Sequence, residues 1–72
     1  MRPPDRRVGQ VISFDEGVGL GQVDCGGIRY PFHCTQIAGG SRTIAVGTAV
    51  SFAVAPGRHG RWEAADLRTA EA

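Results

Sequence analysis

The fold is decided by residues 20–33, which read LGQVDCGGIRYPFH. Gly26 and Gly27 form a two-residue loop, because glycine takes at little cost the positive φ angles that tight hairpin loops require. The segments on either side, residues 20–25 and 28–33, are short and alternate between the two faces of the chain, which is typical of strands. This stretch therefore predicts an antiparallel β-hairpin.

The short loop also determines which residues of the hairpin lie opposite one another. Cys25 is expected opposite Ile28, and the pairing continues as far as Leu20 opposite His33. One face of the hairpin is then predicted to face the core and carries Val23, Ile28, Tyr30 and Phe32. The other face is predicted to meet solvent or a ligand and carries Leu20, Gln22, Asp24, Arg29, Pro31 and His33. A slip of one residue would bury Arg29 and His33, which favours this register.

The rest of the chain repeats the same pattern of short strands and glycine-rich turns. Further strands are predicted at residues 8–14, 48–55 and 61–68, and the long loop 35–47 is expected to hold one helical turn near Gln36. Five strands without a long helix predict an all-β fold, a small five-stranded antiparallel barrel, because closure removes exposed sheet edges. We expect a single domain, with these boundaries: residues 1–8 as an N-terminal arm, 9–68 as the domain, and 69–72 as a C-terminal tail.

The composition restricts the classes of function. The chain has 72 residues, 42% of them apolar, which suits one small domain and is too apolar for a disordered chain. Residues 1–7 contain no apolar segment of the signal-peptide kind, so we expect a cytoplasmic protein that does not enter a membrane. The net charge of +1 does not predict a strong polyanion binder. All eight basic residues are arginine, the side chain better suited to phosphates and bases.

The sequence contains no recognisable catalytic or metal-binding motif. Cys25, His33, Cys34 and His59 do not have the paired spacing of zinc ligands. The register places Cys34 opposite Gly19, roughly 20 Å from Cys25 along the strand, too far for a disulfide. Gly17–Gly21 precedes a strand and not a helix, which argues against a phosphate-binding loop. We therefore expect two free thiols, no metal, no cofactor and no enzymatic activity.

A series of short fragments between Gly9 and Leu67 resembles the cold-shock domain family. The fragments are GQVISFD (9–15), GLGQV (19–23), FHCTQI (32–37), SRTI (41–44), GTAVSFAV (47–54), GRHG (57–60) and EAADL (63–67). The resemblance implies an OB-type barrel that binds single-stranded RNA or DNA with aromatic rings on its second and third strands. It also implies a monomer that acts as a nucleic-acid chaperone or a regulatory accessory protein.

The chain departs from the family pattern at most of the stacking positions. By the resemblance, Phe14 and His33 keep the family's residues, whereas the following positions have lost an aromatic ring: Ser13, Leu20, Gln22, Pro31, Cys34 and Ser41. Because stacking on an aromatic ring contributes about 1–3 kcal/mol per base, we expect weak and sequence-tolerant binding.

Several residues remain candidates for contact with a nucleic acid. They are Phe14, Leu20, Gln22, Arg29, His33, Arg58 and Arg61. Leu20 offers apolar contact, Gln22 can bond a base edge, and the arginines can stack on bases or bond phosphates. A base-contacting role for His33 is favoured over that of a merely exposed strand residue. Trp62 is expected to pack at the end of the barrel, although it could instead supply a substitute ring.

A second hypothesis is that the fold serves as a protein-interaction module with little nucleic-acid binding. The same face would carry Ile12, Leu20 and Pro31 beside polar residues, and an apolar patch with few rings is typical of a partner site. The two hypotheses predict different salt dependence, because binding to phosphates weakens steeply as salt is added.

Overall fold

The β2–β3 hairpin forms as its glycine loop predicts. In the computed structural model, which describes residues 6–57 and 60–70, Gly26 and Gly27 have φ angles of 60° and 91°. They join β2 (Leu20–Cys25) to β3 (Ile28–His33). The pairing runs from Cys25 opposite Ile28 to Leu20 opposite His33, which confirms the predicted register.

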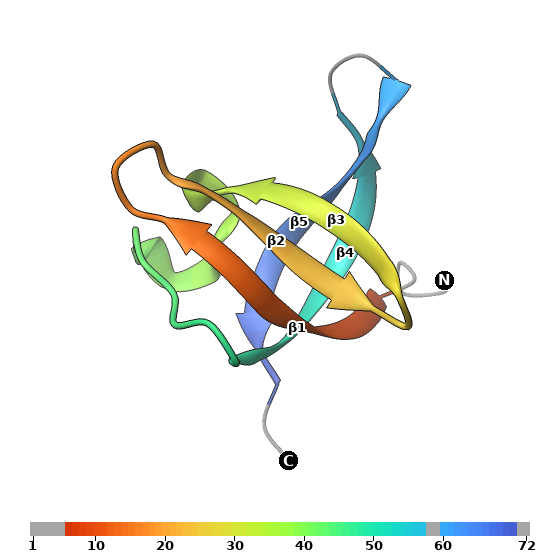
Figure 1. Ribbon diagram of the computed structural model, residues 1–72, viewed down its shortest axis with the longest axis horizontal. Helices are drawn as coiled ribbons and strands as arrows, with labels where there is room; N and C mark the ends of the chain where they lie inside the picture. The colour runs from red at the N-terminus through yellow and green to blue at the C-terminus, as the bar shows by residue number, and fades with distance from the viewer. Residues whose placement is uncertain (1–5, 58–59, 71–72) are drawn as a thin grey trace.

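Five antiparallel strands make up one curled sheet (Figure 1). The other strands are β1 (Arg6–Asp15), β4 (Ala49–Pro56) and β5 (Trp62–Thr69), and the order across the sheet is β3-β2-β1-β4-β5. The sheet curls until β3 and β5, its two end strands, contact each other. The all-β, five-stranded antiparallel fold is therefore confirmed. Among the described residues no ladder joins β3 to β5, so hydrogen-bonded closure of the barrel stays a prediction.

Two bulges help the sheet to curl, since an extra residue on one strand increases its local twist. One interrupts the β1–β2 pairing between Val11 and Ser13. The other interrupts the β4–β5 pairing between Ser51 and Ala53, where Asp66 on β5 takes a φ of 50°. The expected helical turn near Gln36 is also present, as the 3₁₀ turn η1 (Cys34–Gln36), and a second turn, η2 (Ala38–Gly40), follows it.

The boundary of the N-terminal arm needs correction. β1 begins at Arg6, so residues 6–8 belong to the sheet and not to the arm. The reason is that these residues pair with β4, from Arg6 opposite Ala53 to Val8 opposite Ser51. Alternation of apolar and polar residues detects only the part of a strand that has one buried face. Residues 6–8 are exposed and are held in the sheet by their backbone pairing with β4, so this pattern did not detect them.

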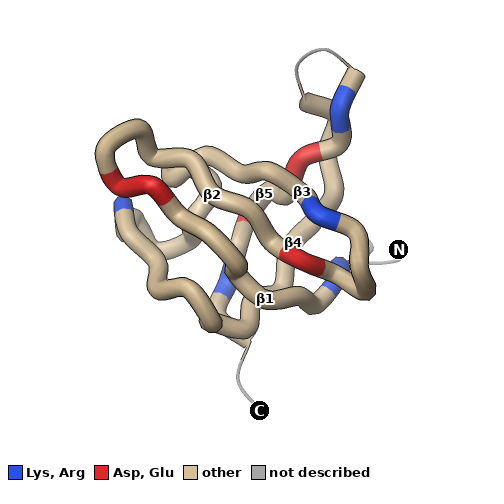
Figure 2. Tube along the Cα trace, viewed as in Figure 1, with Lys and Arg blue, Asp and Glu red and all other residues tan. Residues whose placement is uncertain are grey.

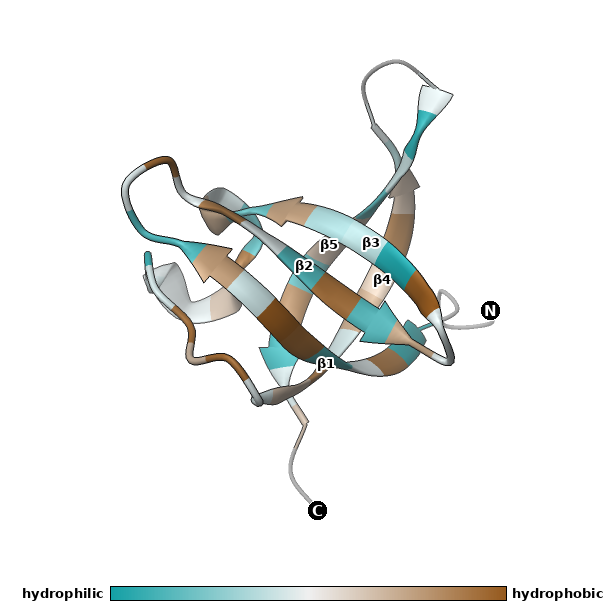
Figure 3. Cartoon of the chain, viewed as in Figure 1, coloured by the Kyte–Doolittle hydropathy of each residue, from teal (hydrophilic) through white to brown (hydrophobic). Residues whose placement is uncertain are grey.

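The core lies inside the curl of the sheet. Its buried side chains are Val11, Val23, Tyr30, Phe32, Ile37, Val50, Phe52, Ala64 and Leu67. Hydrophilic and hydrophobic bands alternate along β2 (Figure 3), as expected for a strand with one covered face. The predicted inward positions Val23, Tyr30 and Phe32 are confirmed. The inward position predicted for Ile28 was wrong, because this residue lies beside the loop at the end of the hairpin and is 56% exposed.

Candidate nucleic-acid interface

The side of β1, β2 and β3 that faces away from the core presents three rows of paired residues, which we call the outer face. The rows are Asp15–Leu20–His33, Ser13–Gln22–Pro31 and Gln10–Asp24–Arg29. Their sequence neighbours Val11, Val23 and Phe32 are buried, and side chains alternate along a strand, so the rows point outward. Four of the predicted contacts therefore share one surface: Leu20, Gln22, Arg29 and His33.

Two open pockets adjoin the middle of the outer face, and Leu20 and Pro31 line both of them. The larger pocket has a volume of about 630 Å³ and lies between β3 and the turn that joins β4 to β5; it is lined by Leu20, Pro31, Phe32, His33, Pro56, Gly57 and Glu63. The smaller, about 380 Å³, is lined by Ser13, Leu20, Gly21, Gln22 and Pro31. A flat ligand could rest on Pro31 with room on either side.

The imidazole ring of His33 is held in place by the turn that follows β3. The backbone N–H of Thr35 donates to Nδ1 of His33 at 3.2 Å, and the Thr35 hydroxyl lies 3.0 Å from the same atom. A backbone N–H can only donate, so Nδ1 accepts, and the neutral ring carries its proton on Nε2. His33 thus caps η1 while its ring remains exposed. The capping role was not predicted, because histidine is not among the residues that commonly cap a turn.

Phe14, which the resemblance made a candidate for contact with a nucleic acid, does not lie on the outer face. It pairs with Gly21, which in turn pairs with Phe32, so all three lie on the core side of the sheet. The two phenyl rings stack with centroids 5.9 Å apart and an interplanar angle of 9°. Gly21 allows this arrangement, because a Cβ there would lie 2.6 Å from the Phe32 ring. Phe14 therefore packs against the core and supports the face from beneath.

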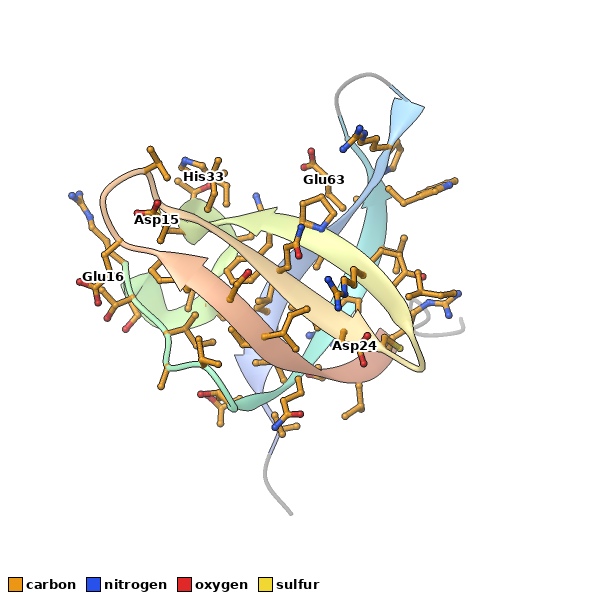
Figure 4. The ribbon with its side chains drawn as sticks, in the orientation of Figure 1. Asp15, Glu16, Asp24, His33 and Glu63 are labelled. Atoms are coloured by element: carbon orange, nitrogen blue, oxygen red, sulfur yellow. The ribbon has the colours of Figure 1, made fainter. Side chains whose placement is uncertain are left out.

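The charges around the outer face are mixed. Arg29 is exposed but pairs across the hairpin with Asp24, so a basic and an acidic residue lie side by side (Figure 2). Arg61 is exposed just before β5, and Arg58 lies outside the described residues. Figure 4 shows Asp15, Glu16, Asp24 and Glu63 distributed around the same side of the molecule as His33. Such a surface attracts polyanions only weakly.

Two charged residues near the outer face were missed by sequence reasoning. Glu63 lines the larger pocket, and Arg42 lines another pocket of about 420 Å³ beside His33, Cys34 and Ser41. Pairing across the β4–β5 turn places Glu63 opposite Ala55. The alternation of β4 could have predicted this pairing. The position of Glu63 beside β3, however, depends on how far the sheet curls.

Trp62 is exposed, and the prediction that it packs at the end of the barrel was wrong. Its side chain is 59% exposed. It pairs with Pro56, where the ends of β4 and β5 extend beyond the other strands (Figure 1). With Arg7, Tyr30 and Val54 it lines a separate pocket of about 330 Å³. This pocket shares no lining residue with the two beside Pro31.

Cys25 and Cys34 are both free thiols and both half-buried. Within residues 6–57 and 60–70 there is no group of three or more His, Cys, Asp or Glu side chains that could hold a metal ion. Nor does that part of the chain contain a helix long and apolar enough to cross a membrane.

No protein-family model matches the chain, and a search of the curated proteins finds no matching relative.

Proposed function

We propose that the protein is a single-stranded nucleic-acid binder of the cold-shock type, and that its outer face contacts the bases of RNA or DNA. The observation that carries the proposal is that the exposed residues Leu20, Gln22 and His33 lie together with the half-buried Pro31, beside two open pockets. Unpaired bases are commonly recognised by stacking on flat side chains and by hydrogen bonds to their edges. His33 offers a ring and a donor at Nε2, Pro31 and Leu20 offer apolar contact, and Gln22 offers an amide.

The proposed binding is weak and largely independent of sequence. One exposed aromatic ring among the described residues of the outer face, that of His33, replaces a platform of several rings. Each lost ring removes about 1–3 kcal/mol, and a dissociation constant near 1 μM corresponds to about 8 kcal/mol. We therefore propose micromolar affinity and a role as a chaperone or regulatory accessory protein. It would act as a monomer in the cytoplasm, with no cofactor and no chemistry of its own.

A second candidate, a protein-interaction module, is favoured by the acidic surroundings of the same face. Leu20 is 52% exposed, and its row also contains Asp15. Asp24 and Glu63 lie farther along this side of the molecule. Carboxylates repel phosphates but do not oppose an apolar contact with a protein rich in arginine or lysine.

The experiment is an anisotropy titration of short fluorescent single-stranded DNA and RNA at about 50 mM and about 200 mM salt. The variants are His33→Ala and its matched control His33→Asn, which retains a side-chain acceptor for the Thr35 N–H but removes the ring. Micromolar binding that falls with salt, and that both variants weaken, is the expected result. If His33→Asn binds as tightly as the wild type, His33 contributes to binding only by capping the turn and not through its ring. Absence of binding at the lower salt would contradict the proposal and favour the second candidate.

A further inference from the structure

The larger pocket lies between β3 and β5, the two end strands, which contact each other but share no ladder among the described residues. The backbone N–H of Cys34 donates to the carbonyl of Gly19 at 2.8 Å, which identifies a hydrogen-bonded pair. Such pairs alternate along an antiparallel ladder. Pro31 therefore directs its backbone away from β2 toward the open edge of β3, and proline has no N–H to donate there. A ladder to β5 could not continue through this position, and the pocket lined by Pro31 and Glu63 lies at this gap.

The carboxylate of Glu63 has a defined place in this pocket. Glu63 is half-buried on β5, and its side chain lies against Gly57, where an added Cβ would overlap the carboxylate group. At the turn between β4 and β5, the N–H of Gly57 donates to the carbonyl of Arg61 at 2.6 Å. The absence of a side chain at Gly57 therefore lets the carboxylate lie close to the turn. Figure 4 shows Glu63 beyond the edge of β3, and Glu63 and His33 line the same pocket.

A carboxylate is a selective partner for a nucleobase, because it accepts hydrogen bonds and cannot donate them. Its two oxygens bind best to two parallel donors, as in a bidentate pair with arginine. On its Watson–Crick edge guanine presents such a pair, N1–H beside the N2 amino group. Adenine and cytosine each place an amino group next to an unprotonated ring nitrogen, which repels the second oxygen. Uracil and thymine offer one N–H between two carbonyl groups.

We infer that the pocket between β3 and the β4–β5 turn is a guanine subsite. The base would rest on Pro31 and Leu20, with its N1–H and N2 amino group donating to the carboxylate of Glu63. This inference rests on the proposed function and adds one position of base selectivity to contacts that are otherwise tolerant of sequence. It also gives a role to a negative charge that would otherwise only oppose the binding of a polyanion.

The test compares short single-stranded oligonucleotides that differ only at one central base: guanine, inosine, adenine, cytosine or uracil. Inosine lacks only the N2 amino group of guanine, so it removes one of the two proposed donors. We expect the guanine oligonucleotide to bind about tenfold tighter than the inosine one, which is what one charge-assisted hydrogen bond contributes. The uracil oligonucleotide should bind more weakly still.

Three variants locate the selectivity. Glu63→Gln should abolish the preference for guanine over inosine, because the amide presents one acceptor where the carboxylate has two. Gly57→Ala should reduce it while leaving the charge in place, because the new methyl group displaces the Glu63 side chain. Glu16→Gln is the matched control, since it removes an exposed carboxylate from the β1–β2 turn and should leave the preference unchanged.

Each outcome is decisive. A preference for guanine that Glu63→Gln removes and Glu16→Gln preserves supports the subsite. Equal binding of all five oligonucleotides, or a guanine preference that survives in Glu63→Gln, overturns the subsite but leaves the proposed function standing. Absence of binding to every oligonucleotide overturns both.

Discussion

The guanidinium group of Arg6, in β1, reaches across β4 to Asp66 in β5. Its Nη1 donates to the Asp66 carboxylate at 2.9 Å and its Nη2 to the Asp66 backbone carbonyl at 2.7 Å. Nη2 also lies 3.1 Å from the hydroxyl of Ser51 in the intervening strand. Arg68 approaches the same carboxylate at 3.2 Å. Arg6 thereby connects the first strand to the bulge of the last, where Asp66 takes its positive φ.

These contacts predict a stability contribution that depends on pH. Hydrogen bonding from Arg68, and further from Arg6, lowers the pKa of Asp66 below its ordinary value of 3.8. The ionised carboxylate therefore stabilises the fold at pH values above 3.8, and the contribution is lost as the pH falls through the lowered pKa. Asp66→Asn should lower the free energy of unfolding at neutral pH, and its difference from wild type should shrink in acid.

Urea unfolding of both proteins at neutral pH and at a pH well below 3.8 measures this difference. Asparagine tolerates a positive φ as aspartate does, so the variant isolates the charge. A difference of the same size at both pH values would show that the carboxylate's charge does not matter.

Gly21→Ala should destabilise the protein by about 1–3 kcal/mol, the usual cost of overpacking. The added Cβ would lie 2.6 Å from both the Phe32 ring and the backbone oxygen of Ser13. Gly17→Ala is the control, because its nearest contact is the Asp15 side chain at 3.2 Å and its φ is not positive; it should change stability by less than about 0.5 kcal/mol. Equal denaturation midpoints for the two variants would contradict the close packing at Gly21.

His33→Ala should lower the free energy of unfolding by about 0.5–1 kcal/mol, toward the lower end of the range for loss of a cap. The alanine removes the acceptor that satisfies the Thr35 N–H. His33→Asn should recover most of the loss, because an asparagine oxygen can accept the same hydrogen bond. Thermal unfolding monitored by circular dichroism distinguishes the three proteins. If His33→Asn is as unstable as His33→Ala, the ring itself stabilises the turn.

Trp62→Ala should change the free energy of unfolding by less than about 1 kcal/mol, since an exposed side chain loses little burial. Phe52→Ala, by contrast, should cost about 3–5 kcal/mol because Phe52 is fully buried. Trp62 is the protein's single tryptophan, so quenching of its fluorescence by iodide reports its exposure directly. Efficient quenching of the native protein is expected. Strong protection from iodide would place the indole ring against the barrel end after all.

The hairpin could be predicted in detail from the sequence because its constraints are local. Two glycines determine the loop, and the loop determines every pairing from Cys25 and Ile28 to Leu20 and His33. Alternation then separates the core side from the outer face without knowledge of the other strands.

The errors occurred where burial depends on distant parts of the chain. Ile28 and Trp62 lie at strand ends, and whether such a side chain is covered depends on how far neighbouring strands extend. Phe14 was expected by resemblance to contact a nucleic acid, but the bulge between Val11 and Ser13 and the pairing with Gly21 place it on the core side of the sheet. Glu63 approaches β3 only because the sheet curls, and no local pattern predicts that approach.

Pro31 has one further consequence, for the behaviour of the protein at high concentration. β3 is an end strand of the sheet, and an unpaired strand edge can recruit a strand from another molecule and begin aggregation. A second strand aligned along β3 would find no donor at Pro31, in the middle of that edge, so the intermolecular ladder would be interrupted there. We therefore expect Pro31, which lines the pocket, also to disfavour strand-to-strand association of two molecules along β3.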